Sequence, residues 1–160
     1  MNNNPSKDLV LNRIIFILSL AGLAMAVYVL QSFLRESSII CLTGGGCEAV
    51  RKNAVSWPFG IPVPAFGLVG YAGLTLLSFL KTLKPEQESS KSLNILLVNK
   101  IMLGIAIFGV CFVTWFTYME IFVIKGICTW CAISAVNMYI ILFLIMKSRK
   151  SSESLKVQKV

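Results

Sequence analysis

Residues 101–119 read IMLGIAIFGVCFVTWFTYM, a stretch of 19 residues without a charged side chain. A helix needs about 20 apolar residues, at ~1.5 Å rise each, to cross the hydrocarbon core of a bilayer. Three further uncharged runs of 20 or 21 residues lie at 14–33, 61–80 and 126–146. They lack the period-two alternation of barrel strands, and only helices and closed barrels satisfy the backbone in lipid. The sequence therefore predicts an all-α membrane protein, a bundle of four transmembrane helices.

The composition supports a membrane protein. Of the 160 residues, 56% are hydrophobic and 14% are charged, and the mean hydropathy is +0.78. Soluble domains carry about 25% charged residues. The net charge of +8 resides on basic residues that flank the apolar runs, so we expect a lipid bilayer and no nucleic acid as partner. The sequence contains no histidine, which excludes catalysis that depends on an imidazole.

The basic residues also predict the orientation of the helices. Eleven of the 15 Lys and Arg residues lie in the N-terminal segment, the loop between the second and third runs, and the C-terminal segment. The two remaining loops hold four. Because positive charge accumulates on the cytoplasmic side, both termini are predicted to be cytoplasmic, and the loops at 35–60 and 120–125 to face outward.

Charge and hydropathy also suggest domain limits. We expect a membrane domain at 14–147 between cytoplasmic tails at 1–13 and 148–160. The first run resembles a secretory signal with a cleavage site at Ala24-Met25-Ala26. Its apolar character continues to Phe33, however, so we expect an uncleaved helix.

The cysteines point to redox chemistry. Cys41 and Cys47 belong to the first outer loop, whereas Cys128 and Cys131 form a Cys-Thr-Trp-Cys motif where the last helix is predicted to begin. All four map to the outer side, where disulfides persist. The fifth, Cys111, falls inside the third run and is predicted to be a packing residue.

The two pairs suit different roles. Three glycines between Cys41 and Cys47 leave that loop free to close into a disulfide or to swing toward a partner. Cys128 is predicted in the first turn of a helix, where the dipole stabilises a thiolate, with Cys131 on the same face. Such a motif is suited to disulfide exchange. Two alternatives remain: a four-cysteine metal site, although a triple-glycine loop does not suit one and we expect no metal, or two static disulfides.

Other residues suggest how the bundle packs. Gly67, Gly70 and Gly73 recur on the second helix and predict close packing against a neighbour. Aromatic residues such as Phe66 and Trp130 are predicted near the outer interface, where a subset can line a flat quinone pocket.

The order of these motifs resembles the vitamin K epoxide reductase family in its bacterial form, over residues 10–147. The resemblance rests on the outer-loop cysteine pair, with Cys47-Glu48-Ala49-Val50 followed by Gly60-Ile61-Pro62 and Phe66-Gly67. It is completed by Cys128-Thr129-Trp130-Cys131.

This resemblance implies a four-helix bundle around a quinone, ubiquinone or menaquinone, capped by the outer loop. It implies that a reduced thioredoxin-like partner passes electrons to Cys41/Cys47. Cys47 then attacks the Cys128–Cys131 disulfide at Cys128, and Cys131 faces the quinone. A separate periplasmic partner is expected, and the membrane is expected to be the bacterial inner membrane.

The resemblance also suggests quinone-binding residues, and two positions depart from the family pattern. Asn53 stands where the family usually has Ser or Thr, and Ser56 is the nearest hydroxyl. These two residues, with Phe66 and Trp130, are predicted to contact the quinone. Ala135 replaces the tyrosine of vertebrate members, which favours a respiratory quinone over vitamin K epoxide.

Overall fold

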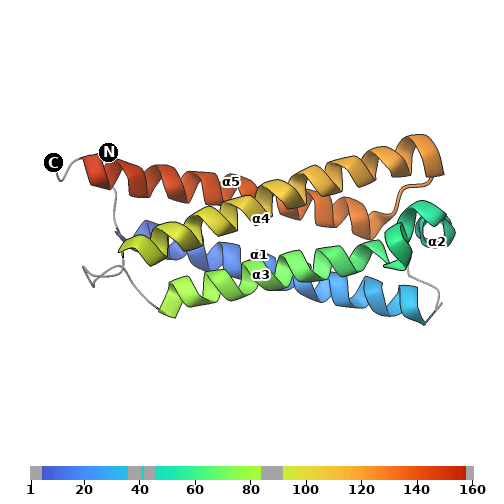
Figure 1. Cartoon of the computed structure of the whole chain (residues 1–160), viewed down its shortest axis with the longest axis horizontal. Coiled ribbons are helices and arrows are strands. Elements are labelled where there is room, and N and C mark those ends of the chain that lie inside the picture. Colours follow the sequence, from blue (N-terminus) through green and yellow to red (C-terminus); the bar gives the residue numbers. More distant parts are fainter. Residues whose placement is uncertain (1–4, 36–40, 42–45, 84–91, 158–160) are drawn as a thin grey trace.

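Four long helices run side by side in alternating directions in the computed structural model (Figure 1). The structure describes residues 5–35, 41, 46–83 and 92–157. The long helices are α1 (Pro5–Leu34), α3 (Val63–Leu83), α4 (Ser92–Met119) and α5 (Thr129–Val157). The short helix α2 (Gly46–Lys52) lies at one end of the bundle. The start of α1 and the end of α5 lie at the other.

Each long helix carries a segment able to cross a membrane. The segments are Leu9–Leu34, Val63–Thr82, Leu97–Ile124 and Thr129–Arg149. Large apolar side chains outside the interior of the bundle remain exposed, among them Ile17, Leu76 and Phe143. Lipid covers such faces at no cost, since its tails are as apolar as the side chains. The predicted all-α bundle with four transmembrane helices is confirmed, and the chain is a membrane protein.

The helices extend past the uncharged runs. α4 begins at Ser92, before the run at 101–119, and α5 continues to Val157, past the end of the run at 126–146. A charged residue ends the part of a helix that can lie in hydrocarbon, but it does not end the helix itself. The start of α5 lies inside its uncharged run, because the helix begins at Thr129 whereas the run begins at Gly126.

The core of the bundle lies where α1, α3, α4 and α5 meet. Tyr71 is 1% exposed, and its hydroxyl group donates a hydrogen bond to the backbone oxygen of Ser134 at 3.0 Å. A Cβ atom at Gly22 would overlap the Tyr71 ring, so only glycine lets α1 pack this closely on α3. Leu74, Ala106 and Ile141 complete a centre with no exposed surface.

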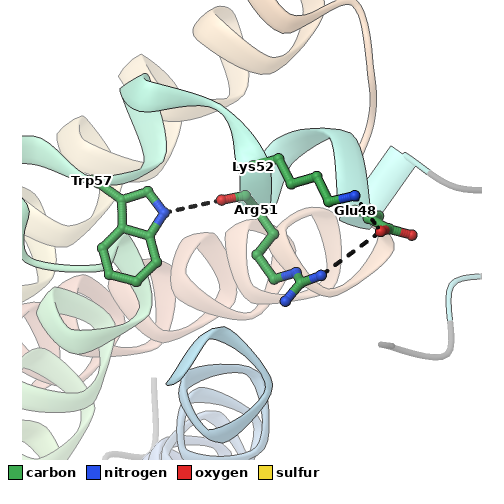
Figure 2. A network of polar contacts seen from close by, with 4 residues as sticks. All are labelled: Glu48, Arg51, Lys52 and Trp57. Carbon is green, nitrogen blue, oxygen red and sulfur yellow. Dashed lines mark hydrogen bonds and ion pairs between the residues drawn. The ribbon is translucent and has the colours of Figure 1, made fainter. Parts of the chain in front are cut away.

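Two 3₁₀ turns follow α2, η1 (Ala54–Ser56) and η2 (Pro58–Gly60), and we call residues 46–60 the cap. Figure 2 shows how polar contacts brace it. The Trp57 indole N–H donates to the backbone oxygen of Arg51 at 3.0 Å. The Glu48 carboxylate pairs with Lys52 at 2.8 Å and with Arg51 at 3.8 Å.

Two further side chains hold the cap from within. The Ser56 hydroxyl is fully buried and donates to the backbone oxygen of Val50 at 2.5 Å. Asn53 caps η1, since its Oδ1 accepts the backbone N–H of Val55 at 3.0 Å. Both residues satisfy backbone groups that the tight turns leave without a helical partner.

Candidate functional site

Both cysteine pairs lie at the cap end of the bundle. Cys41 and Cys47 form a disulfide, whereas Cys128 and Cys131 are free thiols. Cys47 stands in the first turn of α2 and is 1% exposed. It packs in one cluster with the buried Cys128, and Cys41 and Cys131 pack against that cluster. The structure thus brings together the four cysteines predicted from the sequence.

The cap rests directly on the segment that leads into α5. Sγ of Cys41 lies 3.8 Å from Oγ1 of Thr129, the residue that follows Cys128. A Cβ atom at Gly46 would overlap the carbonyl oxygen of Ile127 and approach its carbonyl carbon to 3.1 Å. The contact between these two backbones therefore requires glycine at position 46, and it holds the disulfide beside the motif.

Cys128 occupies the N-cap position of α5. Its backbone oxygen accepts the first helical hydrogen bond, from the N–H of Ala132 at 3.0 Å. The sequence predicts Cys128 in the first turn of the helix. The structure places it one residue before that turn. A residue at this position offers its side chain to the free N–H groups of the first turn.

This position favours the thiolate form of Cys128. A hydrogen bond from the Cys131 side chain is the main cause that lowers the pKa of the Cys128 thiol. The backbone N–H groups of Cys131 and Trp130 act in the same direction, whereas burial and the charge of Glu120 oppose them. Since the thiolate is the reactive form of cysteine, this environment favours Cys128 over Cys131 as the more reactive thiol of the pair.

A large apolar cavity of about 790 Å³ opens beside Cys131 between the helices. Trp130 lines it and packs against Tyr28 at 5.1 Å between ring centroids. Phe66 lines the cavity too, and its ring centroid lies 5.6 Å from that of Phe112. Volume and lining fit a flat, apolar ligand such as a quinone ring.

Two residues predicted to contact the quinone lie elsewhere. Asn53 and Ser56 are absent from the cavity lining, and their side chains hold the cap by the hydrogen bonds described above. A third prediction, close packing at Gly67 and Gly70, is wrong: a Cβ atom at either would meet nothing within 4 Å. These glycines line the cavity instead, and their lack of side chains leaves it open.

Comparison with known proteins identifies the family. The sequence matches the profile of the vitamin K epoxide reductase family over residues 13–146, which is most of the chain and includes all four site cysteines. The chain belongs to the vitamin K epoxide reductase family. No curated protein matches the sequence. Membership implies a membrane oxidoreductase, and members of the vitamin K epoxide reductase family in general use quinones and work with a thioredoxin-like redox partner.

One residue of this family member was not singled out by sequence reasoning. Glu120 falls in a segment predicted to be a short outer connection, yet its side chain is 1% exposed. It begins a turn of π-helix, η3 (Glu120–Ile124), that ends at Lys125 in the left-handed conformation. The sequence carries no signal for this burial, because an acidic residue in a connection between two membrane-spanning runs is ordinarily exposed.

The Glu120 carboxylate faces the motif. One ligand atom from each of Glu120, Cys128 and Cys131 lies within 4.8 Å of the others. Within the part of the chain that the structure describes, this cluster supplies three such atoms, whereas a closed zinc site uses four. A site made of four cysteines would in addition require Cys41 and Cys47 as thiolates, and here they are joined to each other.

Proposed function

We propose that the chain passes electrons from a reduced thioredoxin-like protein to a membrane quinone, and so supports disulfide formation in exported proteins. One observation carries the proposal: Cys131 lines the apolar cavity, and its motif partner Cys128 lies in the same buried cluster as Cys47 of the Cys41–Cys47 disulfide. The site thus has one redox pair toward the cap and another toward the space that fits a quinone.

The proposed transfer proceeds by two disulfide exchanges. The partner's dithiol reduces the Cys41–Cys47 disulfide and leaves as a disulfide. The Cys47 thiolate then attacks Sγ of Cys128 in the Cys128–Cys131 disulfide, and Cys41 resolves the mixed disulfide. The loop pair is oxidised again and the motif becomes a dithiol, and these are the oxidation states found in the structure.

The last step returns the motif to a disulfide. The Cys128/Cys131 dithiol loses two electrons and two protons, and the quinone is reduced to a quinol. Phe66 and Trp130 are proposed to hold the quinone ring in the cavity beside Cys131. Asn53 and Ser56 are proposed to act from the cap, by holding the turns that cover this end of the bundle.

We further propose that the cysteine end faces the outer side of a bacterial inner membrane. The start of α1 and the end of α5 lie together at the opposite end of the bundle, and the basic residues favour the cytoplasm for that end. A periplasmic thioredoxin-like partner would then reach the cap without crossing the membrane.

The test is turnover by the purified protein in detergent. Dithiothreitol supplies electrons, a short-chain ubiquinone or menadione accepts them, and the reaction without protein is subtracted. We expect turnover by the intact chain and by Cys111→Ala, since Cys111 lies apart from the site, and none by Cys131→Ala. If the intact chain reduces neither quinone, the proposal fails. The alternative is a membrane scaffold with static disulfides or a four-cysteine metal site. Static disulfides would not exchange with added thiols, and a metal site would bind one metal ion per chain.

A further inference from the structure

The Glu120 side chain lies buried beside both thiols of the motif. Its carboxylate is 1% exposed, lies within 4.8 Å of Sγ of both Cys128 and Cys131, and interacts with the Cys131 side chain and the Cys128 backbone. One of its oxygens, Oε1, has no hydrogen-bond partner. An oxygen that is buried without a donor is able to receive a proton.

No cation balances the Glu120 charge within the part of the chain that the structure describes. A buried carboxylate without one is expensive to maintain, more so within a membrane-spanning segment. Other titratable or charged groups on the elements packed around this turn are paired with one another or exposed: Glu48, Arg51 and Lys52 on α2, Tyr118 on α4, and Lys125. Glu120 therefore faces the two thiols.

The local backbone aims this side chain inward. The backbone oxygen of Glu120 accepts the N–H of Gly126 at 3.1 Å, a bond that spans the wide π-turn. π-turns inside α-helices frequently mark functional sites. Here the turn ends α4 and connects it to the segment that carries Cys128.

We propose that Glu120 is a catalytic proton acceptor for the Cys128/Cys131 dithiol, an inference that rests on the proposed quinone reduction. When the S–S bond forms, two S–H bonds break and two electrons pass to the quinone. The Glu120 carboxylate takes the proton of the Cys131 thiol and then releases it toward the cavity. The proton of the Cys128 thiol is the second that the quinone takes up, so the quinol receives two protons in total and the carboxylate is ready for the next cycle.

A purely structural role is the competing explanation, because the carboxyl group also binds the Cys128 backbone. Glu120→Gln separates the two, since an amide oxygen still accepts a backbone N–H but cannot take up a proton at neutral pH. Glu120→Asp keeps an acceptor and serves as the conservative control.

The experiment measures reduction of a short-chain ubiquinone by dithiothreitol over a range of pH. At neutral pH we expect Glu120→Gln to be about 100-fold slower than the intact chain. Its rate should recover as the pH rises, because hydroxide then replaces the missing acceptor. Glu120→Asp should stay within about tenfold of the intact chain. The Cys41–Cys47 disulfide, detected by gel shift after alkylation, checks that each variant is folded.

The outcomes separate this inference from the proposed function. An intact chain without turnover refutes the function itself. An intact chain that turns over, together with a Gln variant of equal rate, refutes only the role of Glu120. A Gln variant slowed by the same factor at every pH also refutes it, because that result indicates a structural role. If the Gln variant does not fold, a folded Asp variant without measurable turnover contradicts the proposal.

Discussion

Sγ of Cys41 lies 3.8 Å from Oγ1 of Thr129, so the Cys41–Cys47 disulfide touches the residue that directly follows the first cysteine of the motif. These residues are 88 positions apart in the sequence. Electron transfer by thiol exchange needs the two pairs close together, and the position of the cap places Cys47 and Cys128 in one buried cluster.

Substitution of Gly46 tests whether the cap must rest on the segment before α5. We expect Gly46→Ala to lift α2, because its Cβ atom would overlap the backbone of Ile127, which cannot move aside as a flexible side chain can. Overpacking of this kind costs about 1–3 kcal/mol. Reduction of the motif by the loop pair, followed by gel shift, should slow by about tenfold or more.

Gly126→Ala is the matched control for this substitution. A Cβ atom there would lie 3.5 Å from Cβ of Ala49, an ordinary contact across the same interface. Exchange between the pairs should proceed at the rate of the intact chain. Equal rates in both variants would show that the contact between Gly46 and Ile127 has no part in the transfer.

Removal of Cys131 should trap the exchange between the pairs. In Cys131→Ala, the Cys128 thiolate attacks Sγ of Cys47 and releases Cys41, and no second motif thiol remains to form the motif disulfide. We expect peptide mapping without reductant to find a Cys47–Cys128 disulfide, which Cys111→Ala should not accumulate. A Cys131→Ala chain that retains only the Cys41–Cys47 disulfide would contradict the proposed route.

The reactivity of Cys128 should depend on pH and on its neighbour. Because its pKa is lowered, chiefly by the hydrogen bond from Cys131, the thiolate persists at a lower pH than in an ordinary thiol. In phosphine-reduced chains, the pH midpoint of Cys128 alkylation by iodoacetamide should lie below ~8.5. Cys131→Ala should raise this midpoint, and Cys131→Ser, which keeps a donor, should raise it less. An unchanged midpoint in Cys131→Ala would refute this cause.

The fold was predictable from the sequence because its cause is local. A run such as 101–119 has no charge for the length of a membrane crossing, and such a run in lipid must be helical. The same argument predicts that both cysteine pairs lie at one end of the bundle. Four antiparallel spans bring the first and third connections to the same end, and these connections carry or adjoin the two pairs.

The finer features of the site depend on tertiary packing. Gly67 and Gly70 have the spacing of a close helix contact, but whether a helix or a cavity faces them depends on where α4 lies. The burial of Glu120 depends on a π-turn that sequence patterns do not announce. The side chains of Asn53 and Ser56 form hydrogen bonds with nearby backbone groups. The sequence alone does not show whether such a side chain binds the backbone or a ligand.

Filling the cavity should impair quinone binding and leave the fold intact. Gly70→Leu places its side chain where a Cβ atom meets nothing within 4 Å, in the lining of the cavity. We expect KM for a short-chain ubiquinone to rise about tenfold, with little change in the melting temperature. Gly22→Ala should behave in the opposite way, because it displaces the buried Tyr71 ring and lowers the melting temperature. An unchanged KM in Gly70→Leu would place the quinone elsewhere.

A single-turnover experiment tests the central claim most directly. The chain is prepared with the Cys41–Cys47 disulfide and the Cys128/Cys131 dithiol, freed of reductant, and mixed with a short-chain ubiquinone. The quinol formed and the disulfides present are then quantified by mass spectrometry. The account predicts one quinol per chain, with a Cys128–Cys131 disulfide appearing at the same rate. Absence of quinol, or quinol formed while Cys128 and Cys131 remain thiols, would contradict it.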